Sequence, residues 1–476
     1  MPKSTILKNK VDNSIAMLKR DGMGTDELNM NNVKLSKLPM NSSMEIRKLR
    51  EDFSILESSY LRRQLDKKNL NDFIQKDKEW RENSMKLNKM RADKNVLSKQ
   101  INKDRNNTEL LAKAKELDNQ ISDKTKESRD IEEMRDNLML SLANVLDSEI
   151  SDTETIALGY SGVPRVAKEL ESEFKDKYPG IKYTAMEKTK TQYDIIREYG
   201  LVDEDKGSEL AGSRFYYKLN ELVTLTQALA LYATRKLAKM GFSLIEPPYL
   251  VRKFVEERAT TLDAFEETLY KINGEELYLI PTAEHPIAAY NNKKVFKETD
   301  LPIHYAGYSP AFRKEAGAHG KDTKGIYRNH HFNKVEQYVI CTPEQAEAEI
   351  NLLIRNQMSL LRDLELPCRA IVVPSYDMDK KAIIQVDVEG WFPGQNRYGE
   401  LGSHGYMGSW QGIRLNTKYT QKSSTNLEYV HTIYGTMVPV ERTLACILEN
   451  SLGDDGIIRL PKILADMIGV DTINPR

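Results

Sequence analysis

The chain has 476 residues, and its 70 Lys and Arg nearly balance 71 Asp and Glu, which gives a formal net charge of -1. With 40% hydrophobic and 30% charged residues, this length predicts about two to four domains with sizeable cores. No run approaches the ~18 apolar residues that would span a membrane, and the first residues lack the apolar core of a secretory signal. Three cysteines far apart, without a CxxC, exclude a disulfide framework and predict a cytoplasmic protein. The neutral total also argues against a uniformly basic coat for nucleic acid.

Composition divides the chain into three segments. Residues 1–43 carry two glycines, two prolines and no motif, so we expect an N-terminal extension to which the sequence assigns no role. Between Met40 and Leu158 there is neither Gly nor Pro, although the chain holds 25 Gly and 17 Pro. Because Gly and Pro punctuate chains, residues 44–158 are predicted to form long helices. After Gly159 these residues return together with short β-rich runs, which predicts a separate domain over 159–476.

Apolar residues within the helical segment recur at alternating steps of three and four. One such series runs from Phe73 to Ile101 and a second from Leu110 to Leu138, with the polar stretch 102–108 between them. This spacing predicts two long helices that form an antiparallel hairpin with a 3.5-residue seam. On the heptads alone, a dimerisation coiled coil is an equal alternative.

Charge is unevenly distributed along this hairpin. From Glu116 to Glu154 twelve acids face four bases, whereas the stretch 86–115 has nine bases against three acids. A basic tip on a helical rod indicates a phosphate backbone as partner. The basic residues expected to contact such a backbone are Lys86, Lys89, Arg91, Lys94, Lys99, Lys103 and Arg105.

The domain after Gly159 interleaves strand-like runs with helical stretches at 221–240 and 343–364 and shows no regular βαβ rhythm. This order predicts an α+β fold with an antiparallel sheet. Neither a GxGxxG motif opening a βαβ unit nor a GxxxxGK[ST] motif occurs, so Rossmann and P-loop nucleotide sites are excluded.

Thr282 and Glu284 are expected to alternate on one face of a strand end that follows LYLIP. A hydroxyl and a carboxylate together suit an ammonium group, although a surface strand end explains this short motif as well.

The segment 311–337 reads AFRKEAGAHGKDTKGIYRNHHFNKVEQ. We expect Arg313 and Glu315 to alternate on one strand, and Arg328, Phe332 and Glu336 to lie on the strand that returns after a polar loop. Arg is well suited to bidentate binding of phosphate or carboxylate, and an aromatic ring suits stacking on a nucleobase. The constellation predicts a nucleotide site.

Two further segments place charged residues in apolar surroundings. Asp387 and Glu389 share a strand face, for which solvation is a sufficient explanation, while Glu400 and Ser403 could hold Mg²⁺ together with phosphate oxygens. Arg442 falls in the first turn of an apolar helix, where a cation opposes the helix dipole. It is either a surface residue or an arginine directed at a polyphosphate.

These segments, in this order, resemble the three motifs of class II aminoacyl-tRNA synthetases and specifically the seryl-tRNA synthetase family. The resemblance covers residues 44–476 and includes LREDFSILESSYLRRQLD, WRENSMKLNKMRADKNVLSKQI, GLVDEDKGSELAGSRFYYKL, VDVEGWFPGQ and RTLACILEN. It implies a class II antiparallel sheet flanked by helices, a homodimer, and an N-terminal arm that grips tRNA. It also implies activation of serine with ATP and Mg²⁺ and transfer to the 3′ end of tRNA(Ser).

The resemblance also implies roles for individual residues. Arg313, Glu336 and Arg442 would be catalytic, and Glu400 and Ser403 would line the magnesium–phosphate region. The implied ATP site comprises Arg313, Glu315, Arg328, Phe332, Glu400, Ser403 and Arg442. The implied serine site comprises Thr282, Glu284, Arg313, Glu336 and Thr436, of which Glu336 and Thr436 receive the side-chain hydroxyl.

The chain departs from the family pattern at four places. Members usually carry Asn where Tyr434 stands, and Ser/Asn-Cys-Ser/Thr where residues 403–405 read Ser-His-Gly. They usually read Asp-Trp/Phe-Gln at 409–411, which is Ser-Trp-Gln here, and commonly carry Arg in place of Gly399. The alternatives are therefore a paralog that activates another small amino acid, an inactive RNA-binding paralog, or a coiled-coil dimerisation protein with an ATP-binding module.

Overall fold

The computed structural model describes residues 44, 49–261, 268–315, 324–422 and 424–476. By its internal contacts the chain forms two compact units, one of residues 64–143 and one that combines the segment up to Arg63 with residues 144–476. We call them the hairpin unit and the catalytic unit and describe each by itself.

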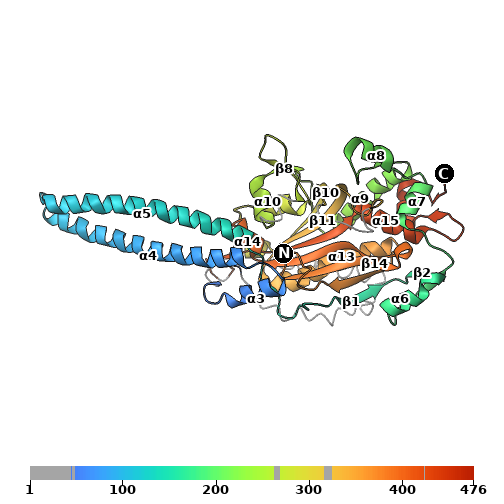
Figure 1. Ribbon diagram of the computed structural model, residues 1–476, viewed down its shortest axis with the longest axis horizontal. Helices are drawn as coiled ribbons and strands as arrows, with labels where there is room; N and C mark the ends of the chain where they lie inside the picture. Colours follow the sequence, from blue (N-terminus) through green and yellow to red (C-terminus); the bar gives the residue numbers. More distant parts are fainter. Residues whose placement is uncertain (1–43, 45–48, 262–267, 316–323, 423) are drawn as a thin grey trace, which may run out of the picture. The chain divides into compact units, whose positions relative to one another are not determined.

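The hairpin unit consists of two long antiparallel helices, α4 (Lys68–Lys103) and α5 (Thr108–Ser141), shown in Figure 1. Asn107 caps α5 through a hydrogen bond of 3.1 Å from the Leu110 N–H to its side chain. All eighteen positions of the two predicted series, twelve of them apolar, are buried or half-buried. The predicted helices, the turn at 102–108 and the seam are confirmed.

Polar residues in the seam have partners across it. Asn83 donates to Glu127 at 3.1 Å, Lys94 is ion-paired with Asp118, and the guanidinium of Arg135 lies 4.4 Å from the centre of the Trp80 ring. Such pairs fix the register of two helices at some cost in stability. Lys86, Lys89, Arg91, Lys99, Lys103 and Arg105 are exposed on the unit.

The catalytic unit is built on an eight-stranded sheet in the order β1-β12-β13-β14-β17-β11-β10-β6 (Figure 1). Every neighbouring pair is antiparallel except β10 with β6, so the predicted α+β class is confirmed. The strands are β1 (Ile156–Ser161), β6 (Ser243–Ile245), β10 (Ile303–Phe312), β11 (His331–Cys341), β12 (Cys368–Val372), β13 (Ile384–Phe392), β14 (Arg397–Gly408) and β17 (His431–Pro439).

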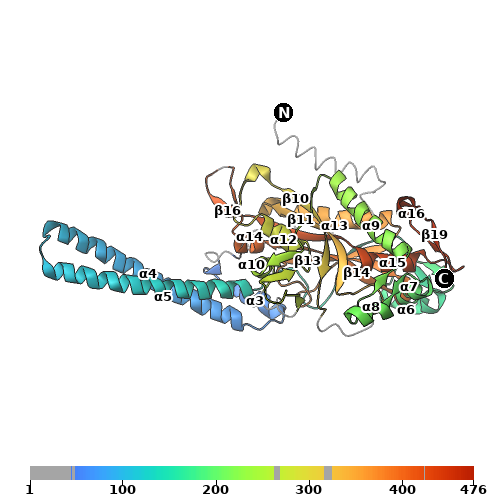
Figure 2. The ribbon, with the colours of Figure 1, turned by 90° about the horizontal axis from the view of Figure 1, so that it is seen from above.

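Helices cover both faces of this sheet. In Figure 2, α9 (Glu221–Lys239) and α13 (Ala346–Asp363) lie along the same side of the strands. A Cβ on Gly435 of β17 would lie 3.0 Å from a methyl group of Leu353 in α13, so the sheet needs glycine there for the helix to approach. On the other face, a Cβ on Gly307 of β10 would lie 2.3 Å from Ile287 in α12 (Glu284–Tyr290). The start of α12 is thereby held over the centre of the sheet.

Smaller elements complete the catalytic unit. None of the helices in the described parts of the chain is long and apolar enough to cross a membrane. The remaining helices are α3 (Ser54–Arg62), α6 (Glu171–Lys177), α7 (Gln192–Glu198), α8 (Glu204–Ala211), α10 (Lys253–Ala259), α14 (Trp410–Arg414), α15 (Val440–Ser451) and α16 (Lys462–Ile468). Short strands include β2 (Arg165–Ala167), β3 (Thr184–Met186), β7 (Leu250–Arg252), β8 (Leu277–Leu279), β9 (Val295–Lys297) and β15 (Lys418–Thr420).

Four local predictions were wrong. The helical segment predicted to reach Leu158 ends with α5 at Ser141, and β1 begins at Ile156. Thr282 and Glu284 do not share a strand face: β8 ends at Leu279 before Pro281, and Glu284 is the first residue of α12. Arg313 and Glu315 do not continue β10, which ends at Phe312; Glu315 has a positive φ of 48° and turns the chain away. Arg328 precedes β11 and is not part of it.

Candidate active site

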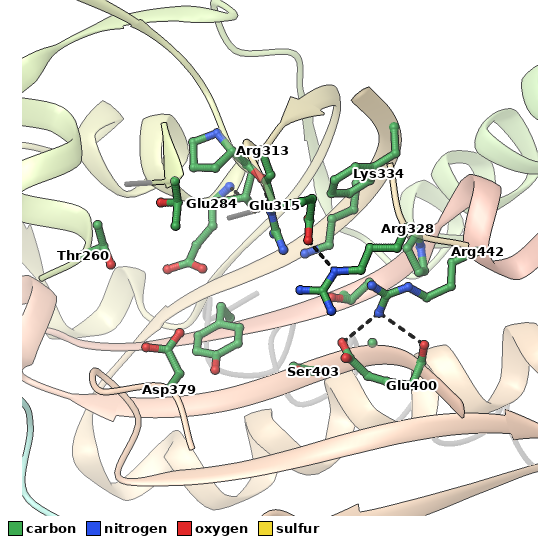
Figure 3. A pocket seen from close by; sticks show the side chains of 18 of the residues that line it. Thr260, Glu284, Arg313, Glu315, Arg328, Lys334, Asp379, Glu400, Ser403 and Arg442 are labelled. Carbon is green, nitrogen blue, oxygen red and sulfur yellow. Dashed lines mark hydrogen bonds and ion pairs between the residues drawn. The ribbon is translucent and has the colours of Figure 1, made fainter. Parts of the chain in front are cut away.

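The site is a cavity of about 560 Å³ over the middle of the large sheet, shown in Figure 3. Strands β11, β14 and β17 supply its floor, and the turns before α12 and after β10 supply its walls. The predicted residues that line it are Thr282, Glu284, Arg313, Glu315, Arg328, Phe332, Glu400, Ser403, Thr436 and Arg442.

Glu336, the remaining predicted residue of the catalytic unit, is not among the residues that line this cavity, and it is almost fully buried behind Thr282 and Lys334, which do line it. Its carboxylate accepts a hydrogen bond of 2.8 Å from the Thr282 hydroxyl and is ion-paired with Lys334. In the sheet it stands directly opposite Thr436. The three residues together form a buried polar end to the cavity, with hydroxyls and a carboxylate side by side.

Glu284 is held from two sides. One carboxylate oxygen accepts a hydrogen bond of 2.9 Å from the side-chain amide of Gln411 in α14. The other oxygen lies 2.9 Å from the ammonium of Lys381. Lys381 also lies 3.5 Å from Asp379. Because these groups are packed into the protein, the orientation of the Glu284 carboxylate is fixed before any ligand arrives.

Arg313 crosses the middle of the cavity. Its Nε donates to the carbonyl of Pro281 at 3.1 Å, and its guanidinium lies 5.2 Å from the centre of the Phe332 ring. Burial lowers the pKa of Arg313, against the raising effect of Glu315. A guanidinium that is this poorly solvated gains strongly from an anionic ligand.

The other arginines are paired with carboxylates. Arg328 is ion-paired with Glu315, and Arg442 lies 3.2 Å from Glu400, as the dashed lines in Figure 3 show. Arg442, the third residue of α15, also lies 4.7 Å from the centre of the Tyr327 ring. Burial opposes ionisation of Glu400, but Arg442 and Arg313 outweigh it and lower the pKa of this carboxyl.

A surplus of negative charge lies beside this arginine cluster. Burial, and then the charge of Glu400, raise the pKa of Asp387 to about 7. Asp387 stands opposite Ser403 in the β13–β14 pair. Crowded oxygen ligands of this kind fit a hard cation such as Mg²⁺. Among the described residues no group of three or more His, Cys, Asp or Glu could hold a metal by itself, so a cation here would need ligand oxygens as well.

Sequence reasoning assigned no role to Lys381, Asp379 or Lys334, although all three line the cavity. The available signal was the charged run 379–381 immediately before the apolar strand β13. A charge at the entrance to a buried strand needs a partner, but the sequence does not say which one.

Two family models match the chain. Residues 44–146 match the seryl-tRNA synthetase N-terminal domain, and residues 265–451 match the tRNA synthetase class II core domain (G, H, P, S and T). Fold and site thus define a class II aminoacyl-tRNA synthetase.

Similar proteins narrow this class. The serine–tRNA ligase of Thermococcus onnurineus is 36% identical over 444 residues, which is 91% of this chain and 97% of the relative. The crystal structure of seryl-tRNA synthetase from Pyrococcus horikoshii complexed with ATP is 35% identical, with a TM-score of 0.86 over 91% of this chain and 100% of that one. The cytoplasmic serine–tRNA ligase of Naegleria fowleri in complex with AMP is 31% identical, with a TM-score of 0.76 over 89% and 96%. The chain belongs to the seryl-tRNA synthetase family.

Proposed function

We propose that the protein is a serine–tRNA ligase, which activates serine with ATP to seryl-adenylate and transfers it to the 3′ end of tRNA(Ser). The observation that carries the proposal is the buried polar end of the cavity, where Glu336 and Thr436 stand side by side in the neighbouring strands β11 and β17 beside Arg313. The names of the relatives support the same activity.

In the activation step the serine carboxylate attacks the α-phosphorus in line and pyrophosphate leaves. Arg313 holds the carboxylate and the α-phosphate, Arg328 and Arg442 bind the outer phosphates, and Phe332 stacks on the adenine. Positioning and charge stabilisation account for most of the acceleration in such a reaction. The ion pairs of Arg328 and Arg442 with Glu315 and Glu400 keep both guanidinium groups ordered before ATP binds.

Serine is selected through its hydroxyl. Glu336 and Thr436 are almost fully buried, and one carboxylate oxygen of Glu336 has no hydrogen-bond partner among the described residues, so a substrate without a hydroxyl would leave this oxygen unpaired in a dry site. A site built to bind a hydroxyl can reject the analogue that lacks it by about 10⁴-fold. This selectivity is expected against alanine and glycine.

Glu400 and Ser403 would hold Mg²⁺ together with the phosphate oxygens, and the ion would neutralise charge that develops on the leaving pyrophosphate. Asp387 next to them adds the negative charge that favours a cation at this place.

We assign residues 44–158 to the tRNA-binding arm, residues 159–476 to the catalytic domain, and no role to residues 1–43. Exposed apolar residues on α9 and the edge strand β6, namely Val223, Leu231 and Leu244, support a homodimer, which sedimentation equilibrium would detect as twice 54.6 kDa. All three cysteines are free and buried, which agrees with a cytoplasmic location.

The experiment is ATP–pyrophosphate exchange with a panel of amino acids. Exchange should depend on serine and should fall at least about 10³-fold in R313A, because removing a preorganised charge costs this much in comparable sites. The matched control is R459A, since Arg459 is exposed and its guanidinium is paired with Asp455 on the surface. Exchange with another amino acid and not with serine would refute the substrate while leaving the class intact.

A further inference from the structure

Three of the residues at which this chain departs from the family pattern, Tyr434, His404 and Gly405, lie together in the sheet. Tyr434 and Gly405 are directly opposite each other in β17 and β14. A Cβ on Gly405 would lie 2.3 Å from the ring of Tyr434, so only glycine leaves room for this ring. In the same register His404 stands opposite Gly435, where a Cβ would lie 2.7 Å from the imidazole. On each face of the two strands a large side chain is thus matched by a glycine.

The ring of Tyr434 lines the cavity and carries a cation on its face. The ammonium of Lys381 lies 4.8 Å from the ring centre, 2.9 Å from Glu284 and 3.5 Å from Asp379. An ammonium over an aromatic face and between two carboxylates is strongly bound. Figure 3 shows the Glu284 and Asp379 side chains on facing sides of the cavity.

The segment that carries Asp379 and Lys381 is held rigidly by its backbone. Arg63 donates to the carbonyl groups of Met378, Asp379 and Ala382. Asn144 donates its backbone N–H to the Lys380 carbonyl at 2.7 Å and its side-chain amide to the Lys381 carbonyl at 2.8 Å. Lys381 is therefore a fixed part of the cavity wall and not a loose surface lysine.

We propose that Tyr434 and Lys381 form a selectivity wall: Tyr434 limits the size of the amino-acid side chain, and Lys381 braces Glu284 and Asp379 for the substrate ammonium. This inference rests on the proposed function and deepens it. Lys381 neutralises one of the two negative charges of Glu284 and Asp379. The ammonium of the substrate neutralises the other. Tyr434 is two residues from Thr436 on the same strand and closes the space beside the hydroxyl-binding end.

The wall is tested by equilibrium binding of serine and threonine, measured by calorimetry on the full chain. In Y434A the ratio of serine to threonine affinity should fall by about tenfold or more, because one methyl group in a fitted pocket is worth about this much. The matched control is Y419A, since Tyr419 is equally buried but does not line the cavity. An unchanged ratio in Y434A, or an equal change in Y419A, would overturn the role of Tyr434.

Lys381 is a positioning residue, and its test uses pH. In K381M the two carboxylates face each other without a cation, so one of them takes up a proton near neutral pH. Serine should then bind about tenfold more weakly at neutral pH, with an affinity that varies with pH, while ATP binding stays constant and K381R restores most of the loss. Tighter serine binding in K381M would contradict the proposal, since Lys381 would then compete with the substrate.

Binding and exchange separate the two hypotheses. Exchange by the unchanged chain reports the proposed function, whereas the affinity ratio and its pH dependence report the wall without any need for catalysis. If the chain binds serine but exchanges with no amino acid, the proposed function fails and the wall is still judged by the variants.

Discussion

Burial affects the protonation of single residues in this protein as much as their side-chain chemistry does. His404 sits in the sheet with no exposed surface, and its Nδ1 lies 3.3 Å from the Val386 carbonyl. Burial, the largest cause, lowers the pKa of His404 to about 3 from an ordinary 6.5. The imidazole is therefore neutral in the folded chain under all ordinary conditions, which excludes it as an acid or base in the reaction.

The pH dependence of stability follows from His404. Below pH 6.5 the unfolded chain binds a proton at this histidine and the folded chain does not, so the free energy of unfolding contributed here falls as pH drops. In H404N this contribution is absent. Urea unfolding of both proteins from neutral pH to about pH 5 should show the steeper acid loss in the unchanged chain. Parallel curves would show that His404 is not buried in its neutral form.

At the scale of elements, the strands were predictable and their ends were not. The β-rich runs at 337–340, 370–373 and 382–391 became parts of β11, β12 and β13, because alternation and β-branched residues predict strands locally. The turns that place Glu284, Glu315 and Arg328 depend on Pro281, on a positive φ and on packing against α12. A short stretch of sequence does not determine those tertiary constraints.

The segment 377–383 is the element on which the amino-acid end of the cavity depends most. Arg63 and Asn144, which anchor it, are the residues that border the hairpin unit in the sequence. The residues immediately before and after the hairpin unit in the sequence are thus the two that hold the segment carrying Asp379 and Lys381.

Replacing Arg63 should loosen this wall. R63M leaves three buried carbonyl groups without their donor, which should lower the free energy of unfolding by about 3 kcal/mol and raise the serine KM in exchange more than the ATP KM. R62M is the matched control, because Arg62 instead holds the carbonyls of Asp147 and Ile150 and the Asp152 carboxylate. Equal effects of both variants on the serine KM would mean that stability, and not the wall, is responsible.

For the whole molecule, net charge is a misleading guide to the partner. The balance of 70 against 71 is a sum over a basic hairpin tip, an acidic return helix and a cavity in which Arg328 and Arg442 pair with carboxylates. The hairpin itself was predictable from the absence of Gly and Pro, but the same absence wrongly extended the helical segment to Leu158, since α5 ends at Ser141 and β1 begins at Ile156. Its seam pairs, such as Lys94 with Asp118, appear only when the two helices are placed side by side.

The exposed bases of the tip should bind RNA through its backbone. Changing Lys99, Lys103 and Arg105 together to Ala should weaken tRNA binding about tenfold or more and flatten its salt dependence, because fewer counterions are released. Changing the acidic residues Glu116, Asp123 and Asp130 to Ala gives the control with the same number of substitutions. Filter binding at several salt concentrations measures both, and a salt slope unchanged by the basic substitutions would refute the assignment of the tip.

The most direct measurement of the central claim is attachment of labelled serine to total tRNA, compared between the full chain and a chain from which residues 86–125 are removed. This deletion takes equal lengths from both helices, because Asn83 pairs with Glu127 just below it. We expect the full chain to charge tRNA with serine and with no other amino acid. The shortened chain should lose charging by about 10²-fold or more while serine-dependent pyrophosphate exchange persists. Charging with a different amino acid, or equal charging by the shortened chain, would contradict it.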